Sequence, residues 1–286
     1  MRAFAPYLVA GLVTAGILVL PAVTFSLLYS ILRFPNFAIG AYMTAGAYAA
    51  FAANRRLGWA MLPSFAVALG ATAVLAIVVD RLAFRPMRRA RPLALLVTSI
   101  GVAFILENLA RFIWGNDIQS YDVPVSRPWA LGPFRINADQ LWIVGVALAF
   151  MVAVHGLLRF TRIGKAMRAT ADNPDLASVR GIDTEAVIRA TWLIGGAMSG
   201  AAGVLLGLDS VVSPLMGSQL LILVFAAAIL GGIGSAYGAM LGALSIGLVA
   251  ELSTAVFPAT YKIAFGFAIM AALLLIRPRG LLGVRA

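Results

Sequence analysis

Long stretches of apolar residues, separated by short polar ones, constrain the fold of this chain more than any other feature. A helix that crosses a lipid bilayer needs about 20 mainly apolar residues. Most of the stretches approach that length, whereas 37–53, 218–230 and 239–252 are short, which predicts re-entrant or broken helices. The candidate membrane segments are residues 7–32, 37–53, 61–79, 93–113, 141–158, 187–208, 218–230, 239–252 and 263–276. The sequence therefore predicts an all-α polytopic membrane protein with about eight to nine membrane segments.

The composition indicates that lipid is the solvent. Of the 286 residues, 62% are hydrophobic and 12% are charged, whereas soluble domains are close to half apolar and about a quarter charged. The apolar stretches are continuous rather than alternating, which excludes a transmembrane strand barrel. The chain has no cysteine, which excludes disulfides and thiolate metal sites. We expect residues 1–286 to form one transmembrane domain without a cleavable signal peptide.

Basic residues gather in the polar stretches and predict the orientation of the chain. One group lies between Arg81 and Arg91, beside the single acid Asp80, and a second lies in the polar stretch 159–183. A third group, close to the C-terminus, consists of Arg277, Arg279 and Arg285. Counting membrane segments places all three groups on one side of the membrane. Cytoplasmic loops carry an excess of arginine and lysine, so this side is predicted to be the cytoplasm. We therefore expect a cytoplasmic C-terminus and a periplasmic N-terminus, although Arg55 and Arg56 fall on the outer side.

Residues 159–186 form a polar segment between two long apolar stretches. Asn173 and Pro174 are typical of a helix start, because Asn caps free N–H groups and Pro suits the first turn. Gly181 is typical of the position just after a helix end. The sequence therefore predicts a short helix at 174–180, led in by further helical turns at 165–171.

A helix as short as 174–180 is unstable alone in water and needs a surface to lie on. Leu176 and Val179 share one of its faces by their spacing of three residues. Two interpretations stay open: a solvated cytoplasmic loop, or a coupling helix that inserts into a groove on a soluble partner.

Glycines recur at 231–242, where they predict either a helix break or close helix packing. The stretch does not match the dinucleotide-binding GxGxxG pattern, and the chain contains no Gly-Lys-Ser or Gly-Lys-Thr of a P-loop. The glycines assigned to this break or packing role are Gly231, Gly232, Gly234, Gly238 and Gly242.

Polar residues inside membrane segments are candidates for a translocation path. The candidates here are Asn36, Tyr42, Tyr48, Glu107 and Asn108. Capping of the following helix is an equal alternative for Asn36, and Lys262 is expected to reach the lipid headgroups instead. His155 is the single histidine and has no partner in the sequence, so we expect neither a metal site nor acid–base chemistry there.

Several motifs, in order along nearly the whole chain, resemble those of branched-chain amino acid ABC transporter permeases of the Liv type. GKAMRATADNPDLASVRGI at 164–182 resembles the ATPase-docking loop, and PNFAIGAY at 35–42 resembles an N-F-A-H-G segment. RLAFRPMR at 81–88, the glycine-rich 225–242 and RPRGLLG at 277–283 resemble further family motifs. The PNFAIGAY motif and the short C-terminus are more similar to the H-like than to the M-like permease. Ile39 stands where the family commonly carries His, which puts the substrate in doubt.

The resemblance implies a type II ABC importer-like permease bundle in a bacterial inner membrane, without enzymatic activity in this chain. It implies partners: a second related permease, two ATPase subunits that bind ATP and Mg, and a periplasmic substrate-binding protein. It implies a docking loop at about 159–186, in which the docking residues are Gly164, Lys165, Arg168, Asp175, Leu176, Val179 and Gly181. The cargo would be a branched-chain amino acid or a related small solute.

Two other functions compete with this one. A stand-alone secondary carrier or channel is the main alternative, because carriers often contain two repeats with paired broken helices, and 37–53 and 218–252 form such a pair. A carrier, however, has no evident need for a capped helix at 174–180. A membrane enzyme is disfavoured because paired carboxylates, a metal-binding cluster and a Ser/His/Asp set are missing from the sequence.

Overall fold

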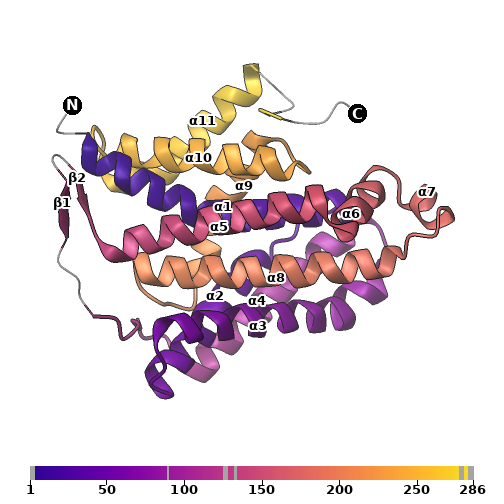
Figure 1. Cartoon of the computed structure of the whole chain (residues 1–286), viewed down its shortest axis with the longest axis horizontal. Coiled ribbons are helices and arrows are strands. Elements are labelled where there is room, and N and C mark those ends of the chain that lie inside the picture. Colours follow the sequence, from indigo (N-terminus) through magenta and orange to yellow (C-terminus); the bar gives the residue numbers. More distant parts are fainter. Residues whose placement is uncertain (1–3, 89, 125–127, 132–133, 277–279, 283–286) are drawn as a thin grey trace.

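The computed structural model describes residues 4–88, 90–124, 128–131, 134–276 and 280–282. Arg277, Arg279 and Arg285 of the basic C-terminus therefore lie outside the described residues. Within the described ranges, helices make up most of the chain (Figure 1), with one hairpin of two three-residue strands. In chain order the elements are α1 Ala5–Leu32, α2 Ile39–Phe51, α3 Met61–Val79, α4 Pro92–Trp114, β1 Trp129–Leu131, β2 Phe134–Ile136, α5 Ala138–Phe160, α6 Arg162–Asp172, α7 Pro174–Val179, α8 Thr184–Asp209, α9 Met216–Gly231, α10 Ala236–Ser253 and α11 Lys262–Ile276.

The helices confirm the predicted membrane bundle. Among the described residues, seven helices are long and apolar enough to cross a bilayer, namely those built on α1, α3, α4, α5, α8, α10 and α11. The apolar helices α2 and α9 are shorter, with 13 and 16 residues, which agrees with the prediction of short segments at 37–53 and 218–230. The same prediction for 239–252 is wrong, because α10 begins before this stretch and its 18 residues are long enough to cross a bilayer. The β1–β2 hairpin was not foreseen by the all-α prediction, and it lies at the end of the bundle opposite α7 (Figure 1).

Helices α1, α2 and α8 form the centre of the bundle, and 11 of the 13 residues of α2 are buried. In the most apolar parts of α1 and α8, 78% and 72% of the residues are buried, against 28% in α4 and α5. The outer helices carry exposed apolar side chains, such as Phe112, Val152 and Leu275. In a bilayer such surfaces face lipid, so the apolar residues on the outside of this protein are the ones that the membrane covers.

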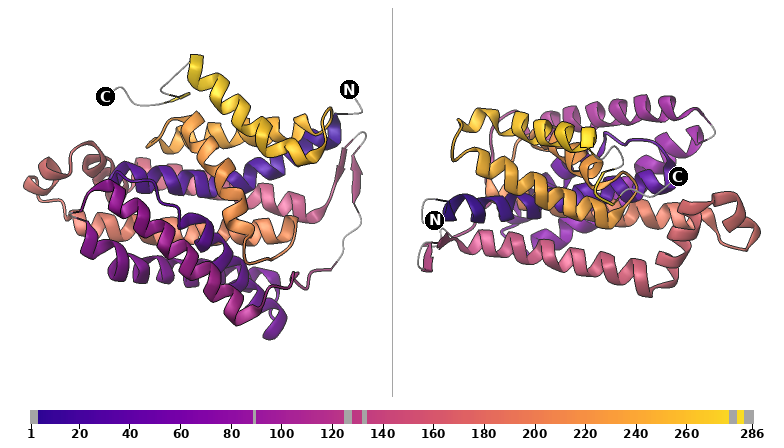
Figure 2. Two further views of the ribbon diagram at one scale, coloured as in Figure 1. Left: turned by 180° about the vertical axis from the view of Figure 1, so that it is seen from behind. Right: turned by 90° about the horizontal axis from the view of Figure 1, so that it is seen from above.

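The packing of the helices reveals an internal repeat. α1 packs along α10 just as α8 packs along α3, and α2 packs on α4 just as α9 packs on α11. The unit α1–α4 therefore corresponds to the unit α8–α11. The first helices of the two units run in opposite directions through the molecule (Figures 1 and 2), so the repeat is inverted.

The two short helices α2 and α9 cross at a pair of glycines. Gly40 is the second residue of α2 and Gly217 is the second residue of α9, and a Cβ on either would collide with the backbone of the other. Close approach of this kind is the usual role of glycine between membrane helices. The crossing joins equivalent positions of the two units, so it lies at the point about which the two units are related.

The chain enters α2 through a non-helical stretch, residues 33–38, in which Phe34, Asn36 and Ala38 are buried. Arg33 ends α1 with φ 57°, which is unusual for a residue with a side chain. Phe34 and Asn36 are each 1% exposed. The Asn36 Oδ1 accepts a hydrogen bond from the Ala38 N–H at 2.9 Å, an Asx-turn that shapes the entry to α2. The N-cap of α2 is Ala38, which has no side-chain cap, so the interpretation of Asn36 as the helix cap is wrong.

Candidate functional site

The polar segment folds as two short helices, α6 and α7, at the right-hand end of the bundle in Figure 1, where α7 projects beyond the other helices. Asn173 Oδ1 accepts from the Leu176 N–H at 3.0 Å and caps α7. At the other end, the Gly181 N–H donates to Ser178 and the Ile182 N–H donates to Ala177, each at 3.0 Å. Gly181 has φ +83°, and this pattern is a Schellman motif. The predicted helix at 174–180 is confirmed, one residue shorter, because Arg180 is its C-cap.

The polar segment is anchored where it leaves α5. The Thr161 hydroxyl accepts from the Gly164 N–H at 3.0 Å and caps α6. Gly164 is buried, and a Cβ there would collide with the Leu157 carbonyl. The Arg33 guanidinium donates to the Ala171 carbonyl and connects the end of α1 to the end of α6. Gly164 and Gly181 therefore shape the segment, whereas other predicted docking residues form its surface.

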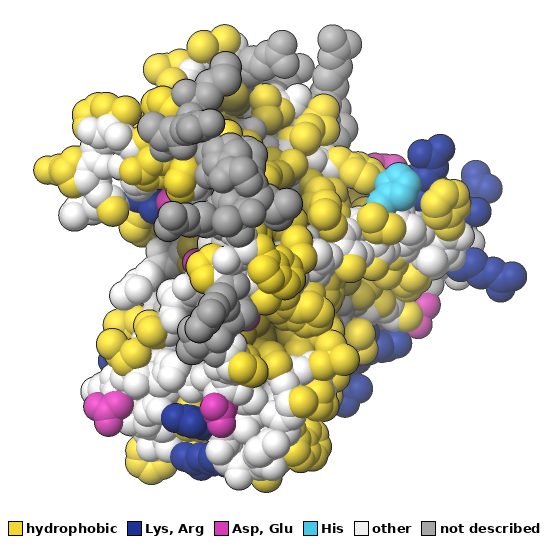
Figure 3. Space-filling view, turned by 60° about the vertical axis from the view of Figure 1, so that its left-hand side comes forward, with side chains coloured by type: hydrophobic (Ala, Val, Ile, Leu, Met, Phe, Trp, Pro, Cys, Tyr) yellow, Lys and Arg dark blue, Asp and Glu magenta, His cyan; other side chains and the backbone are white. Residues whose placement is uncertain are grey.

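That surface combines cations with two apolar side chains. Lys165, Arg168 and Asp175 are exposed, and Leu176 and Val179 are 56% and 82% exposed. In the space-filling view, apolar side chains cover much of the middle of the molecule, whereas Lys and Arg gather at the right-hand edge beyond the histidine (Figure 3). Exposed apolar residues on a short capped helix, surrounded by cations, form a surface suited to a partner with an apolar groove.

The cap of α7 gives a first testable prediction. Replacement of Asn173 by Ala should destabilise α7 by about 1 kcal/mol, because the Leu176 N–H loses its acceptor. Limited proteolysis within 173–182 should then accelerate roughly five-fold. Asn173→Asp is the matched control, since Asp caps equally well; an Asp variant cleaved as fast as the Ala variant would contradict the capping role.

A second polar cluster, which the sequence analysis missed, joins the exit of the polar segment to α3. The Arg88 guanidinium contacts both oxygens of Asp80 at 2.8 and 2.6 Å and Glu185 at 2.5 Å. Arg85 lies 3.7 Å from Glu185. Burial lowers the pKa of Arg88, but its hydrogen bonds to the two carboxylates and their charges outweigh burial, so the pKa is raised. Nothing in the sequence predicts a contact between residues this far apart, although the basic motif at 81–88 contains Arg85 and Arg88.

The five candidate path residues lie before α2, on α2 and on α4. Tyr42 is buried with its ring edge on Trp192, at 6.4 Å between centroids, and Tyr48 stacks on Trp114 at 4.8 Å. Glu107 is buried on α4, whereas Asn108 is exposed and donates to the Phe104 carbonyl of its own helix. Contact of any of them with a substrate stays a prediction.

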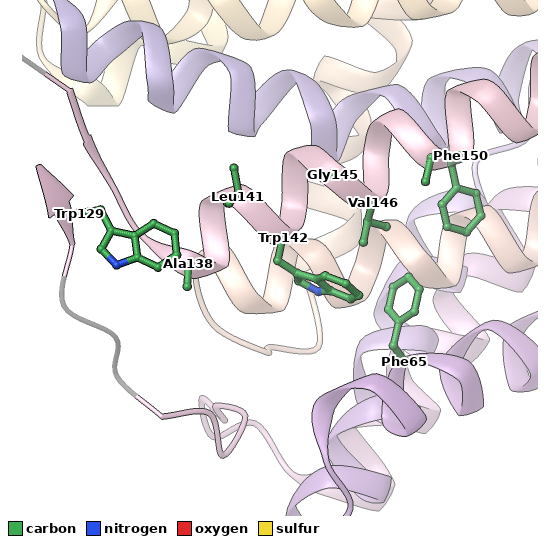
Figure 4. Close-up of a pocket in the computed structure, with 9 residues that line it drawn as sticks. Phe65, Trp129, Ala138, Leu141, Trp142, Gly145, Val146 and Phe150 are labelled. Atoms are coloured by element: carbon green, nitrogen blue, oxygen red, sulfur yellow. The ribbon is translucent and has the colours of Figure 1, made fainter. Parts of the chain in front are cut away.

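An open apolar groove of about 590 Å³ lies elsewhere, along one face of α5 (Figure 4). Phe65 of α3 and Trp129 of β1 line it together with α5 residues such as Trp142, Val146 and Phe150. None of the path candidates contributes to it. Sequence reasoning missed this groove because its residues read as the ordinary apolar face of a membrane helix.

The glycine-rich stretch forms the turn between α9 and α10. Gly232 and Gly234 have φ of +107° and +86°, and the backbones of Gly231 and Gly238 touch across the turn. Gly242 packs against the Ala227 carbonyl. The stretch thus combines a sharp turn with close packing of two antiparallel helices.

Two side chains differ from their sequence interpretation. Lys262 forms an ion pair with Glu251, which also accepts from the Thr14 hydroxyl at 2.6 Å. Lys262 therefore turns toward the bundle rather than to headgroups, because the loop before α11 brings it beside α10. His155 does have a polar partner, since its Nδ1 lies 3.1 Å from the Tyr237 hydroxyl.

Comparisons with known proteins place the chain among transport proteins. A family model described as the permease component of branched-chain amino acid transport systems matches residues 7–276. The high-affinity branched-chain amino acid transport system permease protein LivH of Escherichia coli K12 is 32% identical over 96% of this chain and 93% of LivH. BraD of Pseudomonas aeruginosa, with the same description, is 32% identical over 96% of this chain and 94% of BraD.

A solved structure shares the fold. PsaBC from Streptococcus pneumoniae, in complex with Fab, matches with a TM-score of 0.51 and 14% identity over 96% of this chain and 92% of that one. The predicted family and fold class are thus confirmed. A family match over nearly the whole chain, together with relatives of similar length, leads to one conclusion: the chain belongs to the family of permease components of branched-chain amino acid transport systems.

Proposed function

We propose that this chain is the translocation-pathway subunit of an ATP-driven ABC importer for branched-chain amino acids or related small solutes. The observation that carries the proposal is the polar segment, in which α7 presents Leu176 and Val179 outside the bundle. Exposed apolar side chains on a short helix are unfavourable in water unless a partner covers them. An ATPase subunit is the partner that would connect such a helix to a source of energy.

The proposed arrangement requires partners that supply the remaining functions. A second, related permease would complete the passage, two ATPase subunits would bind ATP and Mg, and a periplasmic protein would deliver the substrate. The excess of cations around α6 and in the stretch 81–91 supports a cytoplasmic position for that end of the bundle. The start of α1 lies at the opposite end (Figure 1) and would then face the periplasm.

A stand-alone secondary carrier is the second candidate, and the inverted repeat favours it. Carriers of several folds are built from inverted repeats with broken helices, and α2 and α9 occupy corresponding positions here. The carrier proposal leaves α7 without a role, however. We therefore prefer the importer.

Uptake by reconstituted protein distinguishes the two candidates. We expect the complete complex in proteoliposomes to accumulate radiolabelled leucine only with ATP and the binding protein present. The chain alone should take up no leucine above empty liposomes, because its energy source lies on other subunits. Concentrative uptake by the chain alone, driven by an ion gradient, would support the carrier and contradict the importer.

A further inference from the structure

The polar segment has a second firm attachment at its exit into α8. Arg88 holds Glu185, the second residue of α8, at 2.5 Å and Asp80 at 2.6 Å. The side chains of Asp80 and Arg88 are only 3% and 15% exposed. Nη1 donates to Glu185 and Nη2 donates to Asp80, and this two-pronged contact with two carboxylates fixes the planar guanidinium in orientation as well as distance. Breaking it would leave a buried charge without its partner, which is costly, so the three residues are expected to move together.

The same end of α3 also contacts the stretch that leads into α2. Asp80 opens a π-helical turn, Asp80–Phe84, which continues α3; such turns are rare and are frequent at functional sites. The Phe84 ring stacks on Trp192 of α8 at 5.0 Å and on Phe34 at 5.5 Å. Trp192 in turn contacts Tyr42 of α2. Side-chain contacts therefore run from Glu185 through Arg88 to Asp80, and from Phe84 to α2, and the backbone of the π-helical turn joins Asp80 to Phe84.

We propose, building on the function proposed above, that the cluster of Asp80, Arg88 and Glu185 transmits displacement of the polar segment to α2. Glu185 is displaced with the polar segment, and Arg88 passes the displacement to the π-helical turn. Phe84 then shifts against Phe34 and Trp192, which border the entrance to α2. Arg88 is thus a positioning residue for transport. Adjacency alone does not establish such coupling, so the test measures coupling directly.

The test compares two variants that each remove one negative charge near the start of α8. Glu185→Gln removes the charge that pairs with Arg88 and leaves at most a weaker, neutral hydrogen bond to its amide oxygen. Asp183→Asn removes only an exposed pair with Arg189 at 3.7 Å, and Asn still caps α8. Both are studied in the complete complex, with radiolabelled leucine uptake and ATP hydrolysis measured in the same proteoliposomes. We expect Glu185→Gln to lower leucine transported per ATP hydrolysed about tenfold, with ATPase association and heat stability unchanged, and Asp183→Asn to match the wild type.

Each other outcome has a defined meaning. An unchanged ratio in Glu185→Gln, or an equal loss in both variants, would overturn the proposal. Loss of ATPase association in Glu185→Gln would overturn it too, because the cluster would then serve attachment. If Glu185→Gln does not accumulate, Arg88→Lys, which keeps the charge but loses the two-pronged contact, should show the same fall in the ratio. A wild-type complex without ATP-driven uptake would contradict the proposed function itself. Failure of the coupling proposal alone would instead appear only in the variants, so the two failures can be told apart.

Discussion

The double substitution Leu176→Asp and Val179→Asp is expected to abolish association of the ATPase with the permease. Both side chains are more than half exposed, so the carboxylates cost the isolated permease little. In the complex they would enter an apolar groove, where loss of a central apolar contact typically costs about 2 kcal/mol and burial of an unpaired charge costs more. Because 1.4 kcal/mol corresponds to a tenfold change, affinity should fall roughly 100-fold or more.

Co-purification and titration of detergent-solubilised permease with ATPase measure this effect. Val256→Asp is the matched control, because Val256 is 72% exposed and lies in the loop before α11, at the opposite end of the bundle from α7. Its variant should bind ATPase like the wild type. Association that survives the double substitution, with the bundle intact by gel filtration, would remove α7 from the proposed interface.

The second large effect is expected at the crossing of α2 and α9. A side chain at Gly217 would strike the Gly40 carbonyl and the Thr44 hydroxyl, which accepts from the Gly217 N–H at 3.3 Å. The backbone fixes the position of the Cβ, so side-chain rotation cannot relieve its collision with the Gly40 carbonyl. The helices would therefore have to separate. We expect Gly217→Val to destabilise the protein by about 3 kcal/mol, the upper end for overpacking. The midpoint of heat inactivation should fall by roughly 10 °C.

Gly156→Val is the control for this prediction. Gly156 lies on α5, and a Cβ there meets nothing within 4 Å. Fluorescence-detected gel filtration after heating compares the two variants in the same detergent. Equal midpoints for Gly217→Val and Gly156→Val would show that the crossing tolerates expansion, and the tight contact would then not determine stability.

Some features of this protein could be predicted because their signals are local. Apolar length determines a membrane helix, and α3 begins and ends where the apolar stretch 61–79 does. The α7 helix could be predicted because Asn173, Pro174 and Gly181 carry start and stop signals within a few residues. The docking role of that helix, in contrast, depends on a partner and stays a proposal.

Other features could not be predicted because they depend on distant contacts. Glu185 and Arg88 are 97 residues apart, and only the folded bundle shows that they meet. The pairing of Lys262 with Glu251 depends on the turn between α10 and α11, so lipid headgroups were the reasonable expectation. Tyr42 and Tyr48 were chosen for their hydroxyls, but the structure places their rings in aromatic contacts. The order of polar and apolar residues along the sequence does not reveal which face of a helix packs against which neighbouring helix.

The inverted repeat has a consequence for the direction of transport. Two units related by inversion present similar helices to both sides of the membrane, so such a bundle by itself has no reason to favour inward over outward movement. The symmetry is broken by what lies between the units, above all by α6 and α7, which project from one end only. On the proposed function, vectorial transport would then originate in the linker between two units whose helices pack in the same pattern. Transferring that linker to the opposite end would reverse the asymmetry without altering the helices that form the passage.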